Sequence, residues 1–148
     1  MSDLTLTRVF RAGIDHVFDY ISKPELVLEW WGPEGMFCPE HNLTLGETGP
    51  WNSVMQAKDG QQFHVSGEVT DVDPPNSVAF TWAWHGEDGA RGPESRVRID
   101  LEAVGAKTLF TLTHSGLVDP ESRASHERGW TSTLAKLERF LPLDETVN

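Results

Sequence analysis

Six histidines and one cysteine are the residues of this 148-residue chain whose types most often serve as metal ligands, bases or nucleophiles. No two histidines form a His-x-His or His-x-x-x-His pattern, and Cys38 has no second cysteine with which to build a ligand set. The chain also lacks a Gly-x-Ser-x-Gly elbow and a glycine-rich phosphate loop before a helix. The sequence therefore predicts no metal, no cofactor and no catalytic residue.

His114 and Ser115 come nearest to a base beside a nucleophile. Neighbouring side chains on a strand point to opposite faces, so these two cannot bond to each other. His114 shares its face with Phe110 and Leu112, which predicts that the imidazole points inward. Two interpretations remain: a core histidine bonded to a backbone carbonyl, or a polar group that orients a bound molecule.

Arg8 falls on the inward face of a predicted opening strand. A buried guanidinium needs a partner. It can pair with a protein carboxylate near a strand end, extend its charged end outward to water, or face an anionic group of a ligand.

The aromatic content is unusual, with six tryptophans, seven phenylalanines and one tyrosine. Each large ring can fill the core or line a pocket. Tryptophan packs efficiently only where its N–H finds some polarity, so the set is compatible with a pocket that holds a few polar groups.

The elements that position these residues follow from hydrophobic periodicity. Val97, Ile99 and Leu101 alternate with charged residues, as on a half-buried strand. Asp59-Gly60 favours a hairpin turn. Strands are predicted over residues 4–10, 51–57, 62–72, 78–85, 96–103 and 108–114.

A long C-terminal helix is predicted from Asp119-Pro120 to Leu141, because Asp can cap a helix and Pro suits its first turn. Its apolar stripe consists of Trp130, Thr133, Leu134, Leu137, Phe140 and Leu141. Two short helices are expected after the first strand, with Val17 and Phe18 in the first and Trp30-Trp31 ending the second. An antiparallel sheet wrapped around the long helix buries all these faces, which predicts one α+β domain over residues 1–148.

The order of elements and several short motifs resemble the START-like helix-grip superfamily, also called SRPBCC. The motifs include Trp30-Trp31-Gly32-Pro33, Gly49-Pro50-Trp51, Leu112-Thr113-His114-Ser115-Gly116 and Gly129-Trp130. Within the superfamily, residues 7–141 are similar to the domain named after the activator of the ninety-kilodalton heat-shock-protein ATPase. The resemblance implies a curved antiparallel sheet of six or seven strands around the C-terminal helix, with two short helices after strand 1.

Proteins of this superfamily commonly hold a lipophilic molecule between sheet and helix, so the resemblance implies a ligand cavity there. The residues expected to line it are Trp30, Met55, Phe63, Val65, Phe80, Trp82, Trp84, Leu101, Phe110, Leu112, His114, Trp130, Thr133 and Leu134. Arg8 and His114 are the candidate polar anchors.

Three functions are compatible with these features. The favoured one is non-enzymatic binding of a small hydrophobic or aromatic molecule. The second is regulation of a heat-shock ATPase as a co-chaperone. The third is an enzyme of aromatase, cyclase or hydrolase type, with His114 as the base and Arg8 as a charge stabiliser.

Composition narrows the partners and the compartment. With 12 basic and 23 acidic residues, the net charge of −11 opposes binding to nucleic acid or to an anionic membrane. No run approaches the roughly 20 apolar residues of a membrane-spanning helix, and residues 1–11 lack a signal-peptide core. A single cysteine suits a reducing cytoplasm. We expect a cytoplasmic monomer or homodimer.

Overall fold

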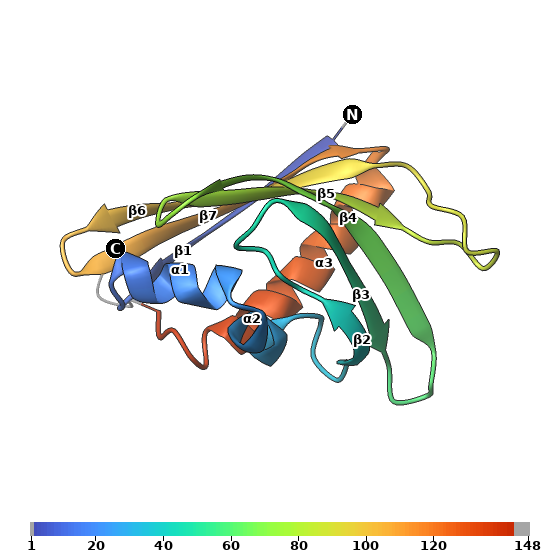
Figure 1. Cartoon of the computed structure of the whole chain (residues 1–148), viewed down its shortest axis with the longest axis horizontal. Coiled ribbons are helices and arrows are strands. Elements are labelled where there is room, and N and C mark those ends of the chain that lie inside the picture. The colour runs from blue at the N-terminus through green and yellow to red at the C-terminus, as the bar shows by residue number, and fades with distance from the viewer. Residues whose placement is uncertain (1, 144–148) are drawn as a thin grey trace.

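The computed structural model describes residues 2–143; residue 1 and residues 144–148, the two ends of the expected domain, lie outside the described residues. Strands and helices follow in the order shown in Figure 1. The strands are β1 Ser2–Phe10, β2 Phe37–Asn42, β3 Gly49–Gln56, β4 Gln62–Asp73, β5 Ser77–Trp84, β6 Ser95–Val104 and β7 Lys107–Leu117. The helices are α1 Ile14–Ser22, α2 Pro24–Trp30 and α3 Pro120–Leu137.

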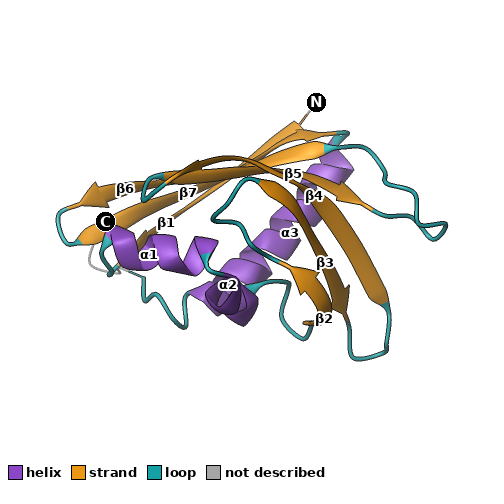
Figure 2. Cartoon of the chain, viewed as in Figure 1, coloured by secondary structure: helices purple, strands orange, loops and turns teal. Residues whose placement is uncertain are grey.

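The strands form one antiparallel sheet in the order β1-β7-β6-β5-β4-β3-β2. The sheet is curved, α3 crosses its concave side, and α1 and α2 lie on that same side (Figures 1 and 2). α3 contacts β1, β7 and α2. This arrangement confirms the α+β helix-grip fold expected from the sequence.

The inner face of the sheet carries the core, as period-2 alternation requires. On β6, Val97 and Ile99 are buried whereas Arg96 and Arg98 are exposed. On the neighbouring strand β7, Phe110, Leu112 and His114 are completely buried. Because β6 and β7 pair directly, Val97 with His114 and Ile99 with Leu112, the inward side chains form continuous rows under α3.

Helix α3 begins as the sequence predicts and ends earlier. The carboxylate of Asp119 accepts a hydrogen bond from Ser122 N at 2.7 Å, which caps the first turn. The helix ends at Leu137 rather than Leu141, so Phe140 does not extend its buried stripe and is 38% exposed. Backbone turns continue beyond it, with Leu141 N donating to Leu137 O at 2.9 Å, and Leu143 then forms a bridge with Phe10 of β1.

The strand β2 is the seventh strand and was not among the six located by alternation. Its side chains are mostly exposed, so no buried face marks it in the sequence. It forms the outer edge of the sheet next to β3. Within residues 2–143, no helix combines the length and apolar character that a membrane span requires.

Candidate functional site

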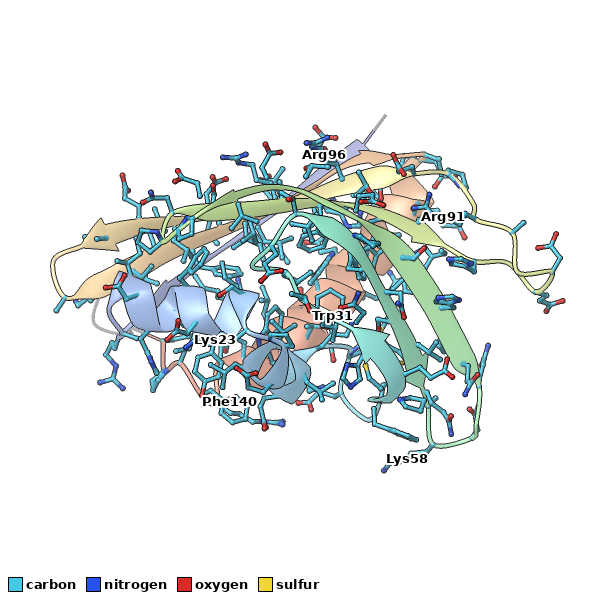
Figure 3. The ribbon with its side chains drawn as sticks, in the orientation of Figure 1. Lys23, Trp31, Lys58, Arg91, Arg96 and Phe140 are labelled. Atoms are coloured by element: carbon cyan, nitrogen blue, oxygen red, sulfur yellow. The ribbon has the colours of Figure 1, made fainter. Side chains whose placement is uncertain are left out.

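An apolar cavity of about 410 Å³ opens between α3, the inner face of the sheet and the loop after α2. Figure 3 shows the labelled Trp31 in the space that the sheet, α2 and α3 enclose. The lining residues are Trp31, Gly32, Pro33, Met55, Phe63, Trp82, Trp84, Ser122, Ser125, His126, Gly129, Trp130 and Thr133. A cavity of this size and apolar character is typical of a small-molecule site.

Four tryptophan rings line the cavity. The ring of Trp82 lies 5.4 Å from Trp130 and 5.4 Å from Trp84, and Trp31 lies 6.1 Å from Trp130 with its ring nearly perpendicular. The Trp31 indole is held by a hydrogen bond from its Nε1 to Ser53 Oγ at 2.9 Å. The Trp31–Trp130 and Trp82–Trp84 pairs are edge-to-face and the Trp82–Trp130 pair is tilted, arrangements that aromatic side chains favour.

His114 lies behind this wall and has a defined tautomer. Trp130 Nε1 can only donate, so the His114 Nδ1 atom 3.0 Å away accepts that hydrogen bond. His114 Nε2 therefore carries the proton and donates to Ser95 Oγ at 2.7 Å. Burial, with a smaller effect from nearby His126, lowers the pKa of His114 to about 3. The imidazole stays neutral and holds Trp130 in place.

His126, which lines the cavity, holds Trp84 in the same way. Its Nε2 accepts a hydrogen bond from Trp84 Nε1 at 3.0 Å, so its Nδ1 carries the proton and donates to Ser122 O at 2.7 Å. Both ring nitrogens of His126 are thus occupied within the protein. His114 and His126 thus each orient one tryptophan of the wall.

Six of the residues predicted for the cavity line it in the structure. They are Met55, Phe63, Trp82, Trp84, Trp130 and Thr133. Eight others are buried in the core and are not among the lining residues. They are Trp30, Val65, Phe80, Leu101, Phe110, Leu112, His114 and Leu134. Arg8 lies away from the cavity, where its Nε donates to Glu138 Oε2 at 3.1 Å.

Trp31 lines the cavity in place of the predicted Trp30, and the reason is local. Trp30 is the last residue of α2 and points back toward α1, where its Nε1 donates to Tyr20 O at 2.8 Å. Trp31 follows in an extended conformation, with φ −68° and ψ 133°, which turns its indole toward the cavity. Adjacent residues across a helix end face different directions, so the sequence alone does not separate them.

Sequence reasoning also missed the contribution of α3 before Trp130. Ser122, Ser125, His126 and Gly129 all line the cavity. Steps of three and four residues join them to Trp130 and Thr133, so the helical period carries their signal. They were missed because they are polar or small, whereas the prediction looked mainly for apolar residues at helical spacing.

The described residues contain no cluster of metal ligands and no activated cysteine nucleophile. No group of three or more His, Cys, Asp or Glu residues within 2–143 is placed to hold a metal ion. Cys38 is partly buried, with Sγ 3.8 Å from Ser53 Oγ, and burial raises the pKa of its thiol. A raised pKa keeps the thiol protonated and weakly reactive at neutral pH.

A second hollow of about 520 Å³ lies on the opposite face of the sheet. Its wall is polar and carries charges of both signs, with Glu40, Glu68 and Glu94 alongside Arg91. Arg91 already contacts Glu94 at 3.3 Å. The cavity under α3 is the better candidate site, because it combines apolar walls with few polar groups.

Comparison with known proteins identifies relatives over nearly the whole chain. A family model described as Activator of Hsp90 ATPase homolog 1-like protein matches residues 11–142. The solved structure of the AHSA1 protein from Silicibacter pomeroyi shares 45% identity and a TM-score of 0.89, covering 92% of this chain and 94% of that one. No curated protein matches the chain.

Two more distant structures share the fold alone. A protein from Chromobacterium violaceum has 18% identity and a TM-score of 0.80, with 97% of this chain and 100% of that chain covered. A protein from Mycobacterium smegmatis has 20% identity and a TM-score of 0.77, with 93% and 89% covered.

Proposed function

Since the chain belongs to the family of Activator of Hsp90 ATPase homolog 1-like proteins, we propose that it is a non-enzymatic protein that binds a small hydrophobic or aromatic molecule under α3. The observation that carries this proposal is the cavity of about 410 Å³ walled by Trp31, Phe63, Trp82, Trp84 and Trp130. Its volume lies within the range of small-molecule sites. The proposal places the protein in the cytoplasm, since a single cysteine suits a reducing compartment.

The state of His114 favours binding over catalysis. A general base must reach a reacting atom and must take up a proton near the working pH. His114 is completely buried, both of its ring nitrogens are bonded within the protein, and its pKa is about 3. Arg8, the expected charge stabiliser, is paired with Glu138 away from the cavity.

A thermal-shift panel of lipids, flavonoids, sterols and aromatic acids tests the proposal. A ligand at one hundred times its Kd stabilises the folded state by about 2.7 kcal/mol. Each kcal/mol raises the Tm of a domain of this size by roughly 2–4 °C or more. We therefore expect a saturable rise of at least about 5 °C from a true ligand.

A matched pair of α3 variants ties the shift to the cavity. Ser125→Trp places a large ring at the cavity mouth, whereas Thr131→Trp places the same ring on an exposed part of the helix outside the lining. The shift should persist in Thr131→Trp and disappear in Ser125→Trp. A shift that survives Ser125→Trp, or a panel without any shift, contradicts the proposal.

The family description raises a second function, regulation of a heat-shock ATPase. Adding the purified chain to a chaperone ATPase assay tests it directly. Stimulation that is unchanged in Ser125→Trp would assign that function to a surface other than the cavity.

A further inference from the structure

Gly129 leaves a bare stretch of helix on the cavity wall. It lies in the middle of α3 and lines the cavity, and a Cβ built there meets no atom within 4 Å. Glycine inside a helix is less favourable than alanine, and here no close neighbour requires the missing side chain. The open space beside the backbone is therefore a property of the cavity and not a requirement of packing.

Trp82 lines the same cavity and carries a buried hydrogen-bond donor without a partner. Its side chain is 5% exposed and lines the cavity, and its Nε1 is the one buried side-chain nitrogen or oxygen within residues 2–143 that has no hydrogen-bond partner. The other cavity indoles are bonded, Trp31 to Ser53, Trp84 to His126 and Trp130 to His114. An unpaired buried N–H is unfavourable, and an acceptor supplied by a ligand would satisfy it.

The cavity wall offers no counter-charge. None of its lining residues is an aspartate, glutamate, lysine or arginine. Nε2 of His126 accepts from Trp84 and is occupied by that bond, and the pKa of His114 behind the wall is lowered to about 3. Lys136 lies next to the wall, but its Nζ already donates to Trp31 O at 3.1 Å and Gly32 O at 3.0 Å. A charged molecule would therefore lose its hydration without gaining an opposite charge from the lining itself.

From these three features we propose that the cavity ligand is a neutral, flat aromatic molecule that carries a hydrogen-bond acceptor on its edge. Its ring lies against the bare surface at Gly129 among the tryptophans. The buried indole of Trp82 turns its N–H toward the acceptor on binding and so gains the hydrogen bond that it lacks without ligand. This inference rests on the proposed function and narrows it to a chemical class. Gly129 then selects ligands by leaving room for a flat ring, and Trp82 selects them by donating a hydrogen bond to their acceptor.

Three probes of the same shape separate the parts of this proposal. Fluorenone is flat and neutral with a carbonyl acceptor, fluorene lacks the acceptor, and fluorene-9-carboxylate carries a negative charge. In equilibrium dialysis at neutral pH we expect fluorenone to bind about three- to tenfold more tightly than fluorene, which is the range of one hydrogen bond. The carboxylate should bind more weakly than either.

Two tryptophan variants test the acceptor. Trp82→Phe keeps an aromatic ring and removes the N–H, so the preference for fluorenone over fluorene should fall to about one. Trp84→Phe removes an indole N–H that His126 already uses. It should keep the ratio of the two affinities even if it changes both.

A second pair tests the space at Gly129. Gly129→Leu fills the open region with a good helix former and should abolish fluorenone binding. Thr131→Leu, on an exposed position of the same helix outside the lining, should leave it unchanged. Circular dichroism and thermal unfolding of each variant establish that the fold is kept.

The outcomes separate this inference from the proposed function. Equal binding of fluorene and fluorenone, or a preference that persists in Trp82→Phe, overturns the role of the acceptor while the cavity remains a binding site. Tight binding of the carboxylate, or fluorenone binding that survives Gly129→Leu, overturns the neutral, flat class. If none of the three probes binds but another compound of the panel does, the chemical class is wrong and the proposed function stands. If nothing binds, both are wrong.

Discussion

His114 couples the stability of the protein to pH, because its pKa is about 3 in the folded protein and about 6.5 without the fold. Between these pH values His114 is protonated in the unfolded chain and neutral in the folded protein. Above pH 6.5 this histidine takes nothing from the free energy of unfolding. As the pH drops from 6.5 toward 3, it lowers that free energy by about 1.4 kcal/mol per pH unit.

The variant His114→Gln tests this coupling at the level of one residue. Glutamine offers a donor and an acceptor but does not titrate. Between pH 7.5 and 5.0, wild type should lose about 2 kcal/mol more unfolding free energy than the variant, as measured by urea unfolding. His16→Gln, an exposed position on α1, serves as the control and should follow wild type. Parallel losses in wild type and His114→Gln would contradict the burial of a neutral imidazole.

Arg8 and Glu138 form the least exposed ion pair among the described residues, with side chains 21% and 26% exposed. Their hydrogen bond joins β1 to the residue that follows α3. A double-mutant cycle with Arg8→Gln and Glu138→Gln should give a coupling energy of about 1 kcal/mol, near the upper end for partly exposed pairs. A coupling energy near zero would mean that the two side chains act independently in solution.

At the level of elements, Gly67 allows β4 and β5 to approach closely. A Cβ at Gly67 would lie 2.0 Å from Thr81 O, an oxygen that also accepts a hydrogen bond from Trp51 Nε1 at 3.0 Å. Backbone would have to move to admit it, so Gly67→Ala should lower the unfolding free energy by about 3 kcal/mol. Gly13→Ala is the control, because its φ of −68° is ordinary and a Cβ there meets nothing within 4 Å. Similar urea midpoints for the two variants would contradict this account.

At the level of the whole molecule, a net charge of −11 produces self-repulsion in the folded state. The described ion pairs other than Arg8–Glu138 join side chains that are 40% exposed or more, so salt removes little stability from them. Raising NaCl from about 10 to 150 mM should therefore increase Tm by about 2 °C. The increase should shrink near pH 4.8, where the net charge approaches zero. A decrease in Tm at neutral pH would show that ion pairs outweigh repulsion.

An antiparallel sheet around a C-terminal helix could be predicted because its elements follow local periodicities, and the family resemblance gave the helix-grip fold. Alternation along β6 and β7 and the spacing of Trp130, Thr133 and Leu134 place each side chain on a known face. For the same reason, parity placed Trp82 and Trp84 on the inner face of the sheet, where both line the cavity. The start of α3 was equally local, since its cap lies within the first turn.

The cavity itself was decided by tertiary structure. Parity tells which side chains point inward, but not which of them other side chains cover, and so Phe80 and His114 lie behind the wall while Phe63 reaches its surface. The course of the chain after α3 likewise involves a bridge between Phe10 and Leu143, residues far apart in the sequence. Sequence determined the faces of the elements because those depend on neighbours along the chain. Only the folded chain determined depth and enclosure, because these depend on contacts between distant segments.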